Sequence, residues 1–170
     1  MLLINRVDIS TKVQISNSVF DDTINQYIEQ AQFLDLQDLL GVNFYNDLLR
    51  NSTDANYLNL LNELEYNYKG KIYTNVGLKI PLIYYSYARY VKFGSVQDTP
   101  FGLVEKTNDF SNKVSSNVKQ EIYKQNQQIA FKYWRNVEVY LDRKKELYPL
   151  WAENNCITTK NKTFKISKIS

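Results

Sequence analysis

The sequence predicts a mainly α-helical protein, a helical bundle of about four to five helices with a long extended loop or hairpin and a short C-terminal β-strand or tail. Three observations support this fold class. Apolar residues repeat every three or four positions through most of the 170 residues. The repeat lapses over residues 95–115, which is longer than most connections in compact domains. The segment TFKISKI near the end alternates apolar and polar residues, as an edge strand does.

Length and composition predict one domain with appendages. The chain is 44% hydrophobic and 23% charged, which is typical of a globular protein, and it is short for two domains. We expect an N-terminal arm (1–17), a helical domain (18–148) that carries a projecting loop (95–115), and a basic C-terminal tail (149–170). The arm alternates apolar and polar residues, so it is expected to be extended or loosely ordered.

Two helices are expected to open the helical domain. Ser18 is the predicted N-cap of the first, because Asp21 and Asp22 lie in its first turn, where the helix dipole favours negative charge. Gly41 is expected to end this segment, and a shorter helix follows in VNFYNDLLRN. We expect the two helices to form a bent pair. The apolar stripe of the first helix consists of Phe20, Ile24, Tyr27, Ile28, Ala31 and Leu34.

A third helix and a central helix are expected next. Asp54 is the predicted N-cap of the third helix, which is expected to end at Gly70. Its apolar stripe consists of Tyr57, Leu58, Leu61, Leu64 and Tyr68. The segment KIYTNVG is predicted to be a turn or a short strand. In LKIPLIYYSYARYVKFG apolar residues cover nearly all sides, so this helix is expected to be central to the fold or buried on two sides.

The longest predicted helix extends from Ser116 to about Lys145. At 1.5 Å per residue it would be about 45 Å long, which exceeds what a small bundle needs. One end is therefore expected to protrude or to pack on a partner. Asn126 interrupts its apolar stripe. Pro149 bars further continuous helix, and Trp151 is expected to anchor the turn that follows.

The net charge of +3 conceals a division of charge along the chain. Residues 1–66 contain three basic and ten acidic residues, a net charge of −7, and residues 67–170 contain eighteen basic and eight acidic residues, a net charge of +10. Such a division is typical of contact with nucleic acid. It also suits a subunit whose acidic face packs on a neighbour's basic face in a head-to-tail assembly. A third interpretation is that solvated faces happen to segregate.

The absence of histidine excludes most common catalytic and zinc chemistry. It removes Ser-His-Asp and Cys-His arrangements and histidine acid–base catalysis. Cys156 is the only cysteine, so no intrachain disulfide can form and the chain suits a reducing compartment. Glu63 and Glu65 are two residues apart and cannot share a helix face. We therefore expect no enzyme, no cofactor and no metal.

Two residue patterns leave a chemical or binding role open beside a structural one. A set of carboxylates could gather near a helix end and hold Mg²⁺, although a solvated acidic face is the preferred interpretation; they are Glu29, Asp35 and Asp38. The Tyr and Trp residues between positions 123 and 151 could stack nucleobases. Core packing is the preferred interpretation of these rings.

The segment that interrupts the helical pattern, Asp98–Ser111, is the least ordinary part of the sequence. Thr99 precedes Pro100 and is biased away from helix, and Gly102 suits a turn. The apolar residues that this segment offers in a row are Phe101, Leu103 and Val104. Apolar side chains in a long non-helical loop are expected to be buried against the core or against another subunit.

The order of these segments resembles that of the small head-tail connector proteins of tailed bacteriophages, also called adaptor or head-completion proteins. The resemblance covers residues 18–145, and it is closest to versions from phages of Bacteroidetes hosts such as the crAss-like group. It consists of helix order, the Leu40-Gly41 break and the aliphatic-glycine loop. The segments that carry it are DDTINQYIEQAQFLDLQDLLGVNFYNDLL, LKIPLIYYSYARYVKFG, TPFGLVEK and FKYWRNVEVYL.

The resemblance implies a structural function without catalysis. Such connector subunits form a ring, typically a dodecamer, below the portal, extend the DNA channel and give the tail its docking surface. The implied partners are other copies of the chain, the portal protein, further neck or tail proteins and packaged duplex DNA in transit, with no membrane. The implied location is the neck of the virion, after synthesis in the host cytoplasm.

The expected site residues form three groups. Those expected to contact a neighbouring subunit or the portal are Phe101, Gly102, Leu103 and Val104. Those of the tail, expected to add a strand to a neighbour or to the next ring, are Lys162, Phe164, Ile166 and Lys168. Those that could line the DNA channel are Lys124, Lys132 and Arg135. The alternative function is a nucleic-acid-binding regulatory helical protein that uses the basic C-terminal half.

Overall fold

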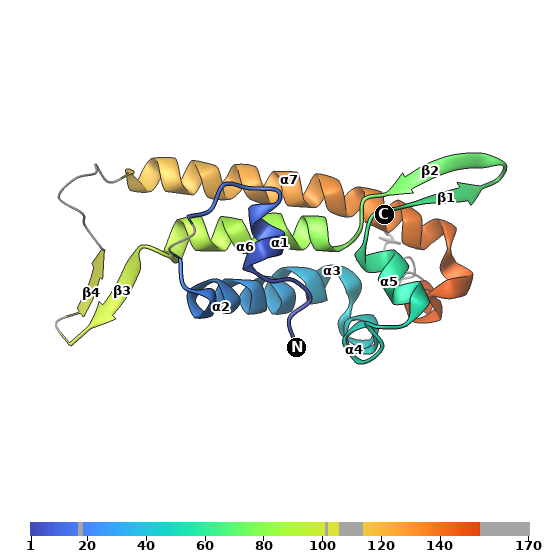
Figure 1. The fold of residues 1–170 in the computed structure, drawn as a ribbon, viewed down its shortest axis with the longest axis horizontal. Helices are drawn as coiled ribbons and strands as arrows, with labels where there is room; N and C mark the ends of the chain where they lie inside the picture. Colours follow the sequence, from blue (N-terminus) through green and yellow to red (C-terminus); the bar gives the residue numbers. More distant parts are fainter. Residues whose placement is uncertain (17–18, 101, 106–113, 154–170) are drawn as a thin grey trace, which may run out of the picture.

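The structure, a computed structural model, describes residues 1–16, 19–100, 102–105 and 114–153 and is mainly helical, as predicted. Its elements surround one helix in the middle of the molecule, α6 (Figure 1). The helices are α1 (Arg6–Ser10), α2 (Asp21–Ala31), α3 (Gln37–Leu40), α4 (Val42–Arg50), α5 (Ala55–Leu61), α6 (Lys79–Phe93) and α7 (Ser116–Arg143). The strands are β1 (Leu64–Tyr68), β2 (Lys71–Asn75), β3 (Val96–Thr99) and β4 (Gly102–Glu105). They form two separate antiparallel hairpins, β1–β2 and β3–β4.

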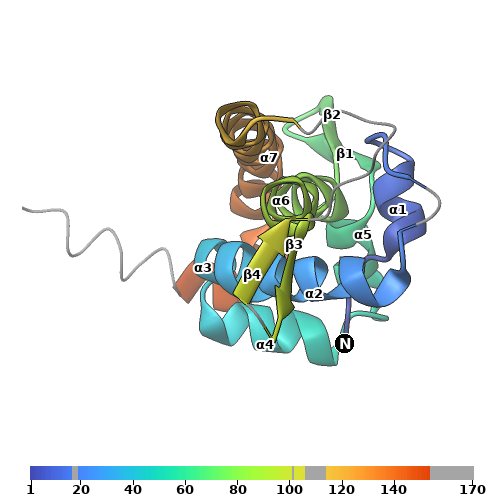
Figure 2. The same ribbon diagram turned by 90° about the vertical axis from the view of Figure 1, so that its left-hand side faces the viewer.

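Helix α6 is the central element, and the sequence-based prediction of a central helix is confirmed. It packs against α7, α2 and α1. In the end-on view, α7 and α2–α3 lie on different sides of α6, and α1 lies on a third side (Figure 2). The residues of α6 that are buried are Pro81, Leu82, Ile83, Tyr85, Ser86 and Ala88. A helix that is apolar on nearly all sides needs this cover from several neighbours.

Helices α2 and α3 form one continuous helix, because a π-helical segment (Gln32–Leu36) joins them. The residues that face the core repeat every four positions; they are Ile24, Ile28, Gln32, Leu36 and Leu40. In a regular α-helix such a repeat drifts around the axis by about 40° per step, and the wider π turn compensates for the drift. Leu34 is 52% exposed, so its predicted place in the apolar stripe is wrong.

The start of α2 also differs from the prediction. The N-cap is Phe20, which makes no side-chain capping hydrogen bond and is 81% exposed, so its predicted place in the stripe is wrong as well. Asp21 and Asp22 occupy the first turn, as predicted. Asp21 also accepts a hydrogen bond from Arg6 (2.7 Å), which ties the start of α2 to α1. Ser18 lies outside the described residues.

Residues 1–16 contact the core, and the expectation of an extended segment is wrong for α1. Asn5 and Asp8 form a capping box, in which each side chain accepts a hydrogen bond from the other residue's backbone N–H. Ile9 is buried. The buried amide of Gln32 accepts a hydrogen bond from the backbone N–H of Leu3 (2.6 Å). The capping box stabilises a helix at α1, and the hydrogen bond to Gln32 holds the N-terminal residues on the core, although the alternating pattern predicted an extended segment.

Gly41 ends the α2–α3 helix, and the predicted bent pair is confirmed. Its φ of 80° lies in the left-handed region that favours glycine. Helix α4 begins at the next residue and packs on α3. Asp54 then occupies the N-cap position of α5, as predicted, but its side chain makes no capping hydrogen bond.

Strand β1 and the turn of the β1–β2 hairpin occupy the second half of the predicted third helix, which is a correction. Strand β2 lies in KIYTNVG, where a turn or a short strand was predicted. Helix α5 ends at Leu61, and the tight turn of the hairpin consists of Lys69 and Gly70. Their φ values of 51° and 76° are the left-handed values that a two-residue hairpin turn requires. Leu64 and Tyr68 are spaced as on a helix, but LEYNY also alternates as a strand does, and the turn decides between the two.

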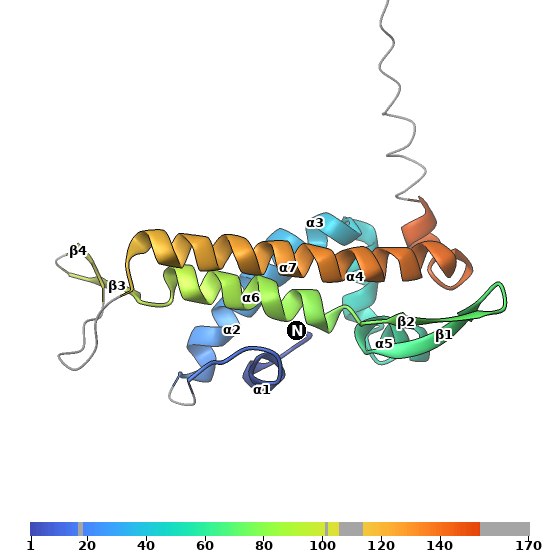
Figure 3. The same cartoon turned by 90° about the horizontal axis from the view of Figure 1, so that it is seen from above.

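Helix α7 is 28 residues long, or about 42 Å, and its ends lie near the two hairpins (Figure 3). Ser115 caps its start by accepting a hydrogen bond from the backbone N–H of Val118 (3.4 Å). Asn126, which interrupts the apolar stripe, is buried and donates a hydrogen bond to the Ile122 carbonyl (2.8 Å). The amide nitrogen of Asn126 therefore has a hydrogen-bond partner despite its burial.

A cluster of aromatic rings packs around Phe44, which is fully buried. Its ring centroid lies 6.1 Å from that of Tyr57, 6.0 Å from that of Tyr148 and 6.1 Å from that of Trp151. Trp151 also contacts Trp134, with a centroid distance of 5.9 Å. Trp151 is thus an anchor for the segment after α7, and the predicted core packing of these rings is confirmed.

Burial raises the pKa of several tyrosines above the ordinary value. For Tyr57 the second cause is Asp47, which accepts the hydrogen bond of the phenol. For Tyr85 burial and the negative charge of Asp35 raise the pKa to about 12. Asp35 forms an ion pair with Arg89 (2.8 Å), which joins the π-helical segment to α6. Neutral phenols are therefore part of the folded core.

We expect the substitution Gly77→Ala to cost more stability than Gly70→Ala. Both glycines have left-handed φ values, 82° and 76°, so each substitution costs about 1–2 kcal/mol of backbone strain. A Cβ at Gly77 would also lie 2.6 Å from the backbone carbon of Asn62, whereas a Cβ at Gly70 would meet nothing within 4 Å. This clash adds about 1–3 kcal/mol. Urea unfolding measures both losses, and equal losses would contradict the close packing of Gly77 on the end of α5.

The folded chain is expected to lose stability as the pH rises through the range from 10 to 12. The pKa of Tyr85 is 10.0 when unfolded and about 12 when folded. Its contribution is therefore fully present below pH 10 and is lost as the pH rises to about 12. In chemical unfolding across this range, Tyr85→Phe should lose roughly 2 kcal/mol less than the parent chain. An identical loss in both proteins would exclude Tyr85 as a source of the dependence.

Candidate functional site

The β3–β4 hairpin extends beyond the helices at one end of the molecule (Figures 1 and 3). It pairs Val96 with Glu105 and Thr99 with Gly102. Thr99 donates a hydrogen bond to the Gly102 carbonyl (2.7 Å), and Gly102 has a φ of 110°. Of the residues predicted as an interface, Gly102 to Val104 belong to β4, and Phe101 lies outside the described residues.

Apolar side chains are exposed where this hairpin joins the helices, which the sequence analysis missed. Phe93 at the end of α6 is 42% exposed, and Val96 at the start of β3 is 46% exposed. Val114 and Val118, at the start of α7, are 49% and 45% exposed. A hydrogen bond from Lys119 to Ser95 (2.7 Å) joins the two segments. We name the four residues Phe93, Val96, Val114 and Val118 the hairpin root.

The predicted channel residues all lie on the outer surface of α7. Lys124 and Lys132 are exposed, and Arg135 is exposed and forms an ion pair with Glu138 (2.6 Å). Tyr133 stacks on Tyr84 with a centroid distance of 5.5 Å, whereas the ring of Phe131 is exposed beside Lys132. This part of α7 therefore presents charge and one exposed aromatic ring.

A groove lies between α6 and α7 beside these basic residues. Its volume is about 400 Å³, and it is lined by Tyr85, Gln127, Gln128, Phe131 and Lys132. Phe131 is 49% exposed. Tyr85 forms a buried part of the lining. The groove therefore combines an apolar ring with one lysine.

The outer surface of α2 and α3 has the opposite charge to that of α7. Residues 21–40 contain five acidic residues and no basic one, whereas residues 116–143 contain five basic and three acidic residues. Asp22, Glu29 and Asp38 are exposed. On α7 the exposed charged residues are Lys124, Lys132 and Arg135 together with Glu121 and Asp142, so its outer surface is weakly basic. Figure 1 shows α2–α3 on one side of α6 and α7 on the other. We name the exposed surface of α2–α3 the acidic side and that of α7 the basic side.

A groove with a mixed polar and apolar lining interrupts the acidic side at the bend between α3 and α4. Its volume is about 310 Å³, and its lining residues are Phe33, Leu34, Gln37, Asp38, Gly41 and Val42. Phe33, Leu34 and Val42 are 61%, 52% and 56% exposed. We name this feature the α3–α4 groove. Helical periodicity placed Leu34 in the core, so the groove was not predicted from the sequence. The signal that could have indicated it is the constant spacing of four residues from Ile24 to Leu40, which a regular α-helix does not keep on one face.

The described residues contain no cluster of three or more His, Cys, Asp or Glu side chains arranged as metal ligands. Asp35, one of the three carboxylates considered for Mg²⁺, is paired with Arg89. In the same described part of the chain, no helix is both long enough and apolar enough to cross a lipid bilayer. The predicted tail contacts Lys162, Phe164, Ile166 and Lys168 lie outside the described residues.

Comparisons with known proteins give a family without a known function. Searches find no match among curated proteins and none among solved structures. Residues 36–161, which include α4 to α7 and both hairpins, match the model of a family of unknown function, DUF6712. Because this match spans most of the chain, the protein belongs to the DUF6712 family.

Proposed function

We propose that the chain is a structural head-tail connector subunit of a tailed-phage neck. In this proposal it forms a ring of about twelve copies below the portal, extends the DNA channel and docks the tail. The ring subunit is the predicted bundle of four to five helices, with α2–α3, α4, α6 and α7 as its main members and the virion neck as its location. The protein acts through assembly, without catalysis and without a cofactor.

The observation that carries this proposal is the opposite charge of two surfaces on different sides of α6. The acidic side carries Asp22, Glu29 and Asp38, and the basic side carries Lys124 and Lys132. Because they are different surfaces of one chain, contact between them in two copies is heterologous. A heterologous contact repeats from copy to copy and closes into a ring when the rotation permits.

Exposed apolar residues favour the interpretation that the two charged surfaces are interfaces between copies over the interpretation that they are only solvated. The acidic side includes Phe33 and Leu34, and the basic side includes Phe131 and Val139, each more than 40% exposed. Apolar residues inside charged surfaces are typical of protein interfaces, where charge sets orientation and apolar burial supplies affinity. The hairpin root adds a third apolar surface at one end, which suits the predicted contact with the portal or a neighbour.

Co-expression with the portal protein of the same genome should yield a ring that native mass spectrometry and particle images detect. The double reversal Lys124→Glu/Lys132→Glu should weaken the ring, because it places acidic residues against the acidic side of the next copy. High salt should weaken the parent ring for the same reason.

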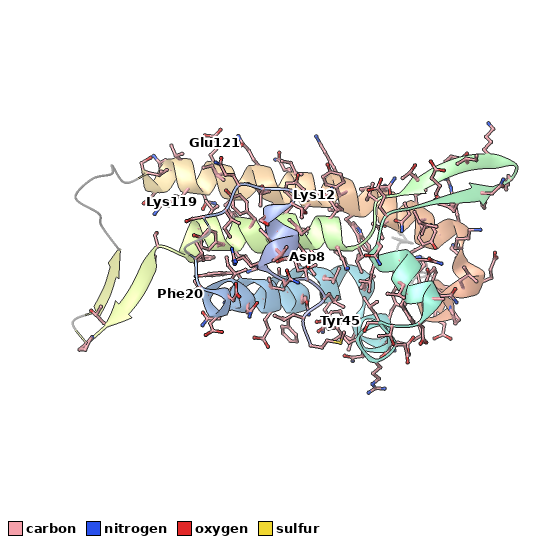
Figure 4. All side chains as sticks on the ribbon, viewed as in Figure 1. Asp8, Lys12, Phe20, Tyr45, Lys119 and Glu121 are labelled. Carbon is pink, nitrogen blue, oxygen red and sulfur yellow. The ribbon has the colours of Figure 1, made fainter. Side chains whose placement is uncertain are left out.

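The matched control is the double variant Lys12→Glu/Arg50→Glu. Lys12 lies just after α1 (Figure 4), and Arg50 ends α4, so neither reversal changes the basic side. This control should assemble as the parent chain does. Equal weakening in both double variants would contradict a role of the basic side, and the absence of any ring with the portal would contradict the proposed function.

A second candidate function is a nucleic-acid-binding regulatory protein, and the exposed row of Lys124, Lys132 and Arg135 on α7 favours it. Fluorescence anisotropy with a duplex DNA probe separates the two functions. The connector should bind duplex weakly and without sequence preference, because a conduit must release its cargo. Tight binding that falls steeply with salt and is lost in Lys124→Glu/Lys132→Glu would favour the regulatory protein instead.

A further inference from the structure

The described part of the chain ends at Glu153, beside the start of α4. The ring of Trp151 packs on that of Phe44, with a centroid distance of 6.1 Å, and its indole N–H donates a hydrogen bond to Asp142 (3.1 Å). Phe44 is two residues after Val42, which lines the α3–α4 groove. The segment after α7 and the bend between α3 and α4 lie side by side in two views (Figures 2 and 3). The chain therefore leaves the described domain close to this groove.

The sequence that follows is basic and carries two apolar residues in one register. Residues 154–170 contain four lysines and no acidic residue. In an extended segment alternate residues share a face. The even positions from 160 to 168 are Lys160, Lys162, Phe164, Ile166 and Lys168, and the odd positions between them are Asn161, Thr163, Lys165 and Ser167. Bound in an extended conformation, the tail would present an apolar pair with a lysine on either side.

The α3–α4 groove offers the complementary residues. The exposed apolar side chains of its lining are Phe33, Leu34 and Val42. Glu29 lies four residues before Phe33 and Asp38 four residues after Leu34, and both carboxylates are exposed. Residues 21–49 contain six acidic residues and no basic one. The groove thus places an apolar surface between negative charges.

Charge distinguishes this groove from two others on the described residues. The groove between α6 and α7 is lined by Lys132 and by no acidic residue. In the groove beside α1, Lys12 and Lys79 balance Asp8 and Glu63. The lining of the α3–α4 groove contains a carboxylate and no lysine or arginine. A segment with four lysines is therefore attracted to this groove over the other two.

The tail is long enough to reach the groove of its own chain. Phe164 is eleven residues after Glu153, and an extended chain of that length spans up to about 40 Å. A ligand joined to its site by a short linker meets that site at an effective concentration on the order of mM. A weak contact of the tail with its own groove is therefore populated without a second copy.

We propose that the C-terminal tail of the chain docks in its own α3–α4 groove. Phe164 and Ile166 contact the apolar side chains of the groove, and the flanking lysines face Asp38 and Glu29. The tail was expected to contact a neighbour, whereas its acceptor in this proposal belongs to the same chain. The contact goes beyond the proposed function and requires no ring. It covers apolar side chains that are otherwise exposed on the acidic side.

Paramagnetic NMR tests the contact in the full-length chain. In a Cys156→Ser background, which removes the only native cysteine, Ser167→Cys carries a nitroxide on the side of the tail that faces away from the groove. A nitroxide broadens the amide signals of residues close to it. The signals of Gln37 and Val42 should lose intensity, and that of Val118 in the hairpin root should keep it. Unchanged signals of Gln37 and Val42 would overturn the contact.

The variant Phe164→Ser/Ile166→Ser removes both apolar side chains and should restore the signals of the groove. The matched control Asn161→Ser/Thr163→Ser changes two residues on the other face of the same tail and should leave the loss of intensity unchanged. An equal loss in both double variants would mean that the nitroxide approaches the groove at random, and it would overturn the contact.

A charge reversal in the groove tests the electrostatic part of the contact. Asp38→Lys should reduce the loss of intensity, because it places a lysine against the lysines of the tail. Glu121→Lys reverses another exposed carboxylate, on α7 (Figure 4), and should not reduce it. Circular dichroism confirms that each variant is folded. An equal reduction in both variants would contradict docking at the acidic groove.

A mixture of two chains distinguishes the chain's own groove from the groove of another copy. An isotope-labelled chain without the nitroxide is mixed with an unlabelled chain that carries it, and no signal should lose intensity. A loss at Gln37 and Val42 in this mixture would overturn docking within one chain and assign the tail to a neighbour. Ring formation with the portal is measured separately, so the failure of either proposal is recognised without the other.

Discussion

The covering of α6 is the constraint on which the rest of the structure depends. This helix is apolar on nearly all sides, so α1, α2–α3 and α7 must each bury one side of it. Each covering helix packs its apolar stripe against α6 and exposes its remaining residues. Because the covering helices lie around α6, their outer surfaces face different directions (Figure 2). The acidic residues of 21–40 thereby lie on one outer surface, and the weakly basic surface of α7 lies on another.

Elements could be predicted where the local sequence pattern and the tertiary packing favour the same structure. The Pro81 helix, the Gly41 break, the Asp54 cap and the Trp151 anchor occur where the pattern places them. The failures have physical causes too. At Leu64 the helical and the alternating patterns coincide, and only the left-handed turn after Tyr68 decides for a hairpin. Such an ambiguity arises where a short segment fits both periodicities, as LEYNY does.

The candidate surfaces were only partly predictable, because the exposure of a side chain depends on its position around the helix axis as well as on the composition of the segment. Leu34 fits the α-helical stripe of α2, yet the π-helical segment turns it outward beside Phe33. The exposed position of Ile72 follows from the hairpin, which the sequence analysis did not expect. Lys124 and Lys132, predicted as possible lining of a DNA channel, lie exposed on α7, and what they face stays a prediction. Only the fold shows which helix lies across α6 from them.

Rigidity is what lets one kind of contact between copies define an assembly. Mobile surfaces would meet at many angles, and the angle between successive copies would vary. Helix α7 packs along α6, which in turn carries α2–α3. The angle between the acidic side and the basic side is therefore a property of the folded chain. Repetition of one fixed angle is the condition under which a heterologous contact closes into a ring rather than into irregular aggregates.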